Sequence, residues 1–299
     1  MDIENFLRYL RSRLSEELNE YKNFRKIRYS KAKQAIQSKC QICDIQCIFV
    51  LSPGRSGTKW LTSIIAENTP FLCHHAPKPC LASSGFIFHQ GIVSNNAIRL
   101  AFYSSREPYL LAAATSGLTY FDADCKNLPF CLEIAQLLPN SRFIHLVRHP
   151  YSFIRSGYSR GYYRHLSPEL WGHLEPNPNT NIPWTKMNHF EKIAWFWNEA
   201  NQISEKLKTN LTSKRTITII SENMFRNLNY LKDTLSQLEI EFGNEIFNRP
   251  IPSPQNTQPY SLLSSQDRND IESAVNQYCS TLTLYYDEAE TKKILKTLS

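Results

Sequence analysis

The hydrophobic positions along the chain form two patterns that alternate: short apolar runs and longer stretches with helical spacing. The apolar runs cover residues 47–51, 71–73, 118–124, 142–147 and 215–220. Stretches with helically spaced apolar residues follow at 60–65, 150–156, 190–201, 223–238 and 266–279. Because strands that alternate with helices usually form parallel sheets, we predict an α/β fold. It has three layers, with a mostly parallel central sheet and helices on both faces.

Two segments depart from this pattern. Residues 80–118 carry short apolar clusters, which we interpret as short helices inserted between strands, where they would cover a ligand site. Residues 1–45 begin with an amphipathic helical pattern and continue with a basic stretch that no acidic residue interrupts. Such a segment either packs on the core or lies on an acidic membrane or partner. We favour the packed appendage and predict two units, 1–45 and an α/β domain at 46–299.

The loop after the first apolar run has the composition of an anion-binding loop. Small residues from Ser52 to Thr58 separate the predicted strand from the predicted helix. At the start of a helix, unpaired backbone N–H groups point at one place, and Arg55 and Lys59 add full charges there. The Gly-Lys-[Ser/Thr] sequence of nucleotide-triphosphate loops is absent, because Gly57 is followed by Thr58 and Lys59. The bland alternative is an ordinary strand-to-helix turn.

A second phosphate-binding pattern follows the fourth apolar run. Arg148 ends that run, Pro150 stands at the start of the next helix, and Ser156 lies two turns into it. A guanidinium group binds a phosphate through two hydrogen bonds, and a hydroxyl on the adjacent helix adds a donor. Both patterns follow strands, so we expect them at the carboxyl edge of the sheet, where open α/β sheets bind ligands.

Together the two patterns resemble those of sulfotransferases that use 3′-phosphoadenosine-5′-phosphosulfate (PAPS), and the resemblance spans roughly residues 46 to 240. It implies a P-loop-like nucleotide-binding core, PAPS as co-substrate, and in-line transfer of a sulfuryl group to a hydroxyl or amine. Arg148 and Ser156 resemble the 3′-phosphate motif of that family. The stretch that resembles its 5′-phosphosulfate loop consists of Arg55, Ser56, Gly57, Thr58, Lys59 and Trp60. The departure is Lys59, which replaces the family's usual Thr or Ser.

The catalytic base is harder to identify. The second apolar run, which we expect beside the first strand, ends in His74 and His75, and Ala76 stands where bacterial relatives have Glu. A neutral imidazole titrates near the working pH, so His75, or His74 beside it, is the candidate base. Arg55 is the second candidate catalytic residue, because it would stabilise charge on the leaving bisphosphate. The reserve candidates for the base are Glu107, Asp122 and Asp124.

Composition and charge bear on the class of ligand, the cellular compartment and the presence of a metal. The net charge of +7 suits an anionic ligand, but the basic residues gather near the N-terminus without the interleaved aromatics of a nucleic-acid surface. Eight cysteines show no paired spacing and no long apolar run is present, so we expect a soluble cytoplasmic protein. The pattern Cys40-x-x-Cys43 has no matching second pair, and no cluster with ligand spacing predicts a metal.

Two other function classes stay open at this point. One is an ATP-dependent small-molecule kinase with an atypical phosphate loop. The other is a binding protein that keeps the sulfotransferase fold but has lost its base, which the Ala at position 76 makes credible. The acceptor is equally open among small molecules, glycans and lipids, and so is the oligomeric state.

Overall fold

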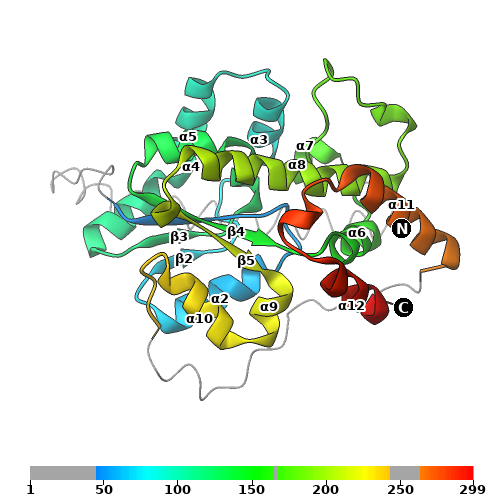
Figure 1. Ribbon diagram of the computed structural model, residues 1–299. Helices are drawn as coiled ribbons and strands as arrows, with labels where there is room; N and C mark the ends of the chain where they lie inside the picture. Colours follow the sequence, from blue (N-terminus) through cyan, green and yellow to red (C-terminus); the bar gives the residue numbers. More distant parts are fainter. Residues whose placement is uncertain (1–44, 165–166, 243–262, 299) are drawn as a thin grey trace, which may run out of the picture.

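A computed structural model describes residues 45–164, 167–242 and 263–298, and these build one five-stranded sheet with helices around it (Figure 1). The strands are β1 (Cys47–Leu51), β2 (Leu72–His74), β3 (Tyr120–Asp122), β4 (Ser141–Val147) and β5 (Thr216–Ile220). Their order is β2-β3-β1-β4-β5, and each neighbouring pair is parallel. The predicted α/β fold with a parallel sheet is confirmed.

The position of β2 differs from the prediction. We expected it beside β1, but β3 lies between them, with Cys47 paired to Tyr120 and Leu72 also paired to Tyr120. All three residues of β3 are buried, whereas those of β2 are half-buried. The more deeply buried strand therefore takes the inner place, and β2 forms the edge of the sheet.

The side chains of β1 alternate between the two faces of the sheet. Phe49 packs in a cluster with residues of α4, α5 and α8, and Ile48 packs in another with residues of α2 and α10 (Figure 1). The helices on these two faces are α2 (Thr58–Asn68), α4 (Asn95–Ser116), α5 (Cys131–Leu137), α8 (His189–Asn210), α9 (Ser221–Arg226) and α10 (Leu228–Ser236). This is the predicted three-layer arrangement.

A third apolar cluster lies beyond the carboxyl end of β4. It joins residues of α6, α8, α11 and α12, so the C-terminal helices pack beside the helix that follows β4. The remaining helices are α3 (Ala82–His89), α6 (Pro150–Ser159), α7 (Pro168–Trp171), α11 (Ser265–Tyr278) and α12 (Glu288–Leu298). Short 3-10 turns are η2 (Cys125–Phe130), η3 (Trp184–Lys186), η4 (Ser213–Arg215) and η6 (Leu282–Leu284).

Between residues 80 and 118 the structure has one short helix, α3, and one long helix, α4, where we expected only short ones. α4 runs for 22 residues through Pro108. A proline removes one helical hydrogen bond, here the one to the carbonyl of Ser104, but Ser104 lies on the exposed side, where water replaces the lost donor. The buried positions Phe102 and Leu110 hold both halves against the core. The sequence pattern therefore predicted separate short helices, whereas packing against the core keeps α4 continuous through Pro108.

Several predictions fall outside the described residues. These are the N-terminal basic segment at 1–44, together with Cys40 and Cys43. Cys47 lies in β1 and is fully buried, as the sequence predicted. In the described part of the chain, no helix combines the length and apolar content needed to span a bilayer.

Candidate functional site

The loop between β1 and α2 has an unusual backbone. Gly54, Arg55 and Gly57 have φ angles of 88°, 56° and 93°. At Gly57 a Cβ atom would lie 2.5 Å from the Cζ atom of Phe225, so this position requires glycine. Gly57 is also the N-cap of α2, and no side chain caps the helix. The N–H groups of its first turn are therefore directed toward the loop, where an anion can accept them.

Hydrogen bonds fix the shape of this loop. The Ser52 hydroxyl accepts from the Gly54 N–H at 3.1 Å, and the Ser56 hydroxyl donates to the Gly54 carbonyl at 3.1 Å. From the other side, the Ser221 hydroxyl at the start of α9 donates to the Ser56 carbonyl at 2.8 Å. The loop is thus preformed, which lowers the entropic cost of binding a ligand there.

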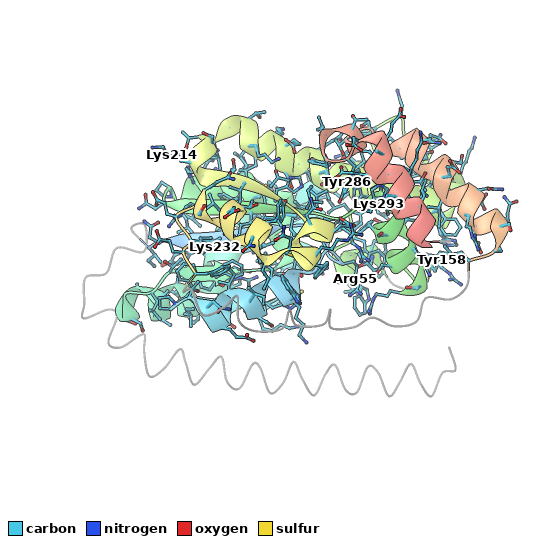
Figure 2. All side chains as sticks on the ribbon, turned by 60° about the horizontal axis from the view of Figure 1, so that its bottom comes forward. Arg55, Tyr158, Lys214, Lys232, Tyr286 and Lys293 are labelled. Atoms are coloured by element: carbon cyan, nitrogen blue, oxygen red, sulfur yellow. The ribbon has the colours of Figure 1, made fainter. Side chains whose placement is uncertain are left out.

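The second phosphate-binding pattern meets this loop at the carboxyl edge of the sheet. Arg55 Nε donates to the Ser156 hydroxyl at 3.1 Å, and Arg148 Nη1 donates to the Arg55 carbonyl at 2.7 Å. Trp197 Nε1 donates to the Arg148 carbonyl at 2.8 Å. In Figure 2, Arg55 lies between Lys232 and Tyr158 along the length of the molecule, while Lys214, just before β5, lies toward one end. The structure therefore unites Arg55, Arg148 and Ser156.

The two histidines after β2 have different surroundings. His75 Nε2 lies 3.1 Å from the Thr58 hydroxyl, in the first turn of α2. Although His75 is on an exposed loop, the protein atoms near its ring lower its pKa, and the charge of Lys59 lowers it further. The His74 ring instead packs against Tyr109 with centroids 4.4 Å apart, and burial lowers its pKa. Only His75 reaches the anion loop.

Lys59 and Trp60 take different positions although they are adjacent. Lys59 is exposed on the first turn of α2, where its charge acts on His75. The Trp60 side chain is 4% exposed, and its ring packs edge-on against Phe225 with centroids 5.2 Å apart. Its indole therefore belongs to the core, and a ligand in the loop can meet this residue only through its backbone.

Asp122, the last residue of β3, and Asp124, two residues later, were reserve candidates for the base, but both pair with Arg106. Arg106 Nε lies 2.9 Å from an Asp122 carboxylate oxygen, and Arg106 Nη2 lies 2.7 Å from an Asp124 carboxylate oxygen. All three side chains are nearly inaccessible to solvent. This pairing removes both aspartates as candidate bases, because a buried carboxylate that neutralises an arginine cannot also meet an acceptor. Glu107 is half-exposed on α4.

Two residues that the sequence did not predict for the site, Cys125 and Tyr162, lie beside the loop, and the charge of Lys126 acts on both. A Cβ atom on Gly54 would be 3.6 Å from Cys125 Sγ and 3.9 Å from the Tyr162 hydroxyl. The Lys126 ammonium donates to the Trp171 carbonyl; burial opposes its charge, but Cys125, Tyr162 and Asp124 outweigh burial and raise its pKa. Lys126 lies in η2, shortly after the end of β3, and that place beyond a strand end was the available signal.

The segment after β5 supports both phosphate-binding patterns. Glu222, in the first turn of α9, accepts from the His149 N–H at 3.1 Å and from the Tyr286 hydroxyl at 2.7 Å. His149 is the neighbour of Arg148, so Glu222 fixes the backbone at the end of β4.

Within the described residues, no group of three or more His, Cys, Asp or Glu has metal-binding geometry.

Neither a protein-family profile nor a curated protein matches the chain. Among solved structures, a sulfotransferase from Mycobacterium tuberculosis aligns with a TM-score of 0.51 at 12% identity, over 83% of this chain and 81% of that chain. A sulfotransferase from Alicyclobacillus acidocaldarius aligns with a TM-score of 0.49 at 13% identity, over 81% and 96% of the two chains. The alignment with the Mycobacterium tuberculosis protein shows that the chain has the α/β fold seen in sulfotransferases.

Proposed function

We propose that the protein is a sulfotransferase that transfers a sulfuryl group from PAPS to a hydroxyl or amine of an acceptor. The observation that supports this most strongly is the joining of Arg55, Ser156 and Arg148 by hydrogen bonds at the carboxyl edge of the sheet. Two guanidinium groups, a hydroxyl and an uncapped helix start at one place make a site for a ligand with two separate phosphate groups.

Each of the two patterns would bind a different part of the donor. The N–H groups of the loop and the Arg55 side chain suit the 5′ side, next to the sulfuryl group. Arg148 and Ser156 suit the 3′-phosphate, which ATP lacks. The donor would therefore be selected by the second pattern rather than by the loop.

The proposed reaction is an in-line transfer. The acceptor oxygen or nitrogen bonds to sulfur while the bond from sulfur to the 5′-phosphate oxygen breaks, and negative charge builds on that phosphate. Arg55 and the loop N–H groups stabilise this charge. His75, held beside Thr58 and with its pKa lowered, takes the acceptor's proton.

The kinase alternative has less support. A kinase would need an aspartate for Mg²⁺ near the phosphate loop. The two aspartates at the end of β3 are instead bound to Arg106. The binding-protein alternative predicts the same donor site without turnover, so activity alone separates it from the enzyme.

The test is a calorimetric titration with 3′,5′-adenosine bisphosphate and with Mg-ATP. We expect the wild type to bind the bisphosphate more tightly than Mg-ATP. Arg148→Ala removes a charged hydrogen-bonding group, so bisphosphate affinity is expected to fall roughly tenfold to hundredfold.

The matched control is Arg142→Ala, since Arg142 lies at the opposite end of β4 and binds the Leu238 carbonyl. Its bisphosphate affinity is expected to equal that of the wild type. Tight binding of Mg-ATP that does not depend on Arg148 would refute the proposal and return the chain to the kinase class.

A further inference from the structure

Helix α4 holds the loop that carries His75. The Tyr109 hydroxyl donates to the Lys78 carbonyl at 2.9 Å, and Arg106 Nη1 donates to the Pro79 carbonyl at 3.0 Å. On the other side of His75, the Ala123 N–H of the β3 end donates to the His74 carbonyl at 2.9 Å. The short segment between these contacts is thus tied to β3 before His75 and to α4 after it.

Arg106 also connects this segment to the residues beside the anion loop. Its two aspartate partners fix the chain after β3: Asp122 accepts from the Asp124 N–H at 2.9 Å, and Asp124 accepts from the Lys126 N–H at 3.0 Å. The Arg106 side chain has no solvent exposure. One buried guanidinium therefore links the His75 segment with the turn that carries Lys126.

His75 itself has little else to fix its position. Within the described part of the chain, Thr58 is the one hydrogen-bond partner of its ring. The next residue, Ala76, has a φ of 50° and no side chain that reaches a partner. The place of the imidazole therefore depends on how the backbone is held on both sides, at His74 by Ala123 and at Lys78 and Pro79 by α4.

We propose that Tyr109 and Arg106 are positioning residues, which act through the backbone of residues 78 and 79 to keep His75 at the anion loop. The inference rests on the role of base proposed for His75. It gives α4, which lies between β2 and β3 in the chain, a part in the reaction that does not require its side chains to contact the donor. It also explains why the site keeps its geometry without a carboxylate at position 76.

The charges that face His75 make its titration a direct measure of its position. Lys59 on α2 lowers its pKa and Asp122 on β3 raises it, while the surrounding protein atoms lower it most. If the segment moves toward solvent, the ring loses both the desolvation and the repulsion by Lys59. Its pKa then rises toward the ordinary value of about 6.5.

The main variant is Tyr109→Phe. It removes the hydroxyl bonded to Lys78 but keeps the aromatic ring, which packs on His74 and stacks with Tyr120 at a centroid distance of 6.3 Å. The matched control is Tyr163→Phe, which also loses a hydroxyl bond to a backbone carbonyl, that of Leu174. Histidine ring signals are followed by NMR as a function of pH, and His75→Gln assigns the resonance.

The second measurement is slow hydrolysis of PAPS with water as acceptor. Water oxygen bonds to sulfur, its proton passes to His75, and sulfate and 3′,5′-adenosine bisphosphate are released. In Tyr109→Phe we expect the His75 midpoint to rise and hydrolysis to fall about tenfold, with bisphosphate affinity unchanged. Tyr163→Phe should leave the His75 midpoint at its wild-type value. Arg106→Lys, once shown to be folded by circular dichroism, should act in the same direction.

The inference is overturned if the His75 midpoint in Tyr109→Phe equals that of wild type, or if Tyr163→Phe shifts it equally. A shifted midpoint with undiminished hydrolysis would overturn the part played in the reaction. Failure of the proposed function looks different: wild type would then not hydrolyse PAPS, whether or not it binds the bisphosphate and whatever the titration shows.

Discussion

The backbone conformation of the anion loop restricts which residues can occupy single positions in it. Gly57 combines a positive φ with close contact to Phe225 and Met224. In Gly57→Ala, the strained backbone costs about 1–3 kcal/mol, and the clash adds to it. Gly117→Ala is the matched control, because Gly117 also has a positive φ, of 64°, but nothing lies within 4 Å of an added Cβ.

Urea denaturation and bisphosphate titration of the two variants separate the effect of backbone strain from the effect of the contact with Phe225 and Met224. Gly57→Ala is expected to lose more stability than Gly117→Ala, and only Gly57→Ala should lose bisphosphate affinity. Equal losses of stability with full affinity in both would show that the contact with α9 has no part in shaping the loop.

The same scale shows what a sequence alone reveals about the site. Arg55, Arg148 and Ser156 were predicted because each follows a strand end at a motif spacing. The choice between His74 and His75 was not predictable, since it depends on which ring faces Tyr109. The loss of Asp122 and Asp124 as bases depends on Arg106, a partner that no local pattern identifies.

Between elements, a polar network joins β4 to α8 and the C-terminal region. Buried His145 lies 2.8 Å from the Asn201 amide oxygen, and Glu205 lies 2.6 Å from both Lys208 Nζ and the Tyr285 hydroxyl. His145, then Lys208 and Tyr285, lower the Glu205 pKa to about 2 against the opposing effect of burial. Glu205 is therefore ionised in the folded protein far below its ordinary range.

The sign of this shift gives a prediction about acid stability. A carboxyl whose pKa is lower in the folded state stabilises the protein fully above its unfolded pKa of 4.5, and this contribution is lost as pH falls toward 2. Glu205→Gln should lower the melting temperature at pH 7 and flatten its pH dependence between those values. Glu288→Gln, in a pair exposed to solvent, should change neither.

The hydrophobic pattern predicts where strands lie in the sequence but not their order in the sheet or whether a helix is continuous. Apolar runs located the five strands of the described residues, most clearly β1, which is buried in the parallel sheet and continuously apolar. The inner position of β3 and the continuity of α4 through Pro108 both depend on packing across the sheet. The predicted helix at 223–238 is two helices, α9 and α10, because Asn227 leaves the helical conformation and caps α10 with its side chain.

At the scale of the whole molecule, the C-terminal region braces the end of β4, where the proposed donor site lies. Tyr286 donates to Glu222, which holds the backbone of His149, and Thr291 of α12 lies 3.4 Å from the His149 ring. Tyr286 and Arg55 both lie near the middle of the molecule in Figure 2, between Lys232 and Tyr158. Residues far apart in the chain therefore meet around Arg148, whose charge acts on the Tyr286 hydroxyl.

The adjacent tyrosines 285 and 286 allow this bracing to be tested with two nearly identical variants. Tyr286→Phe frees Glu222 from one of its two partners, so the end of β4 should be held less firmly and bisphosphate affinity should fall about threefold to tenfold. Tyr285→Phe loses a comparable bond to Glu205, away from the loop, and should retain full affinity. Equal affinities in calorimetry would mean that the C-terminal helices stabilise the fold without setting the donor site.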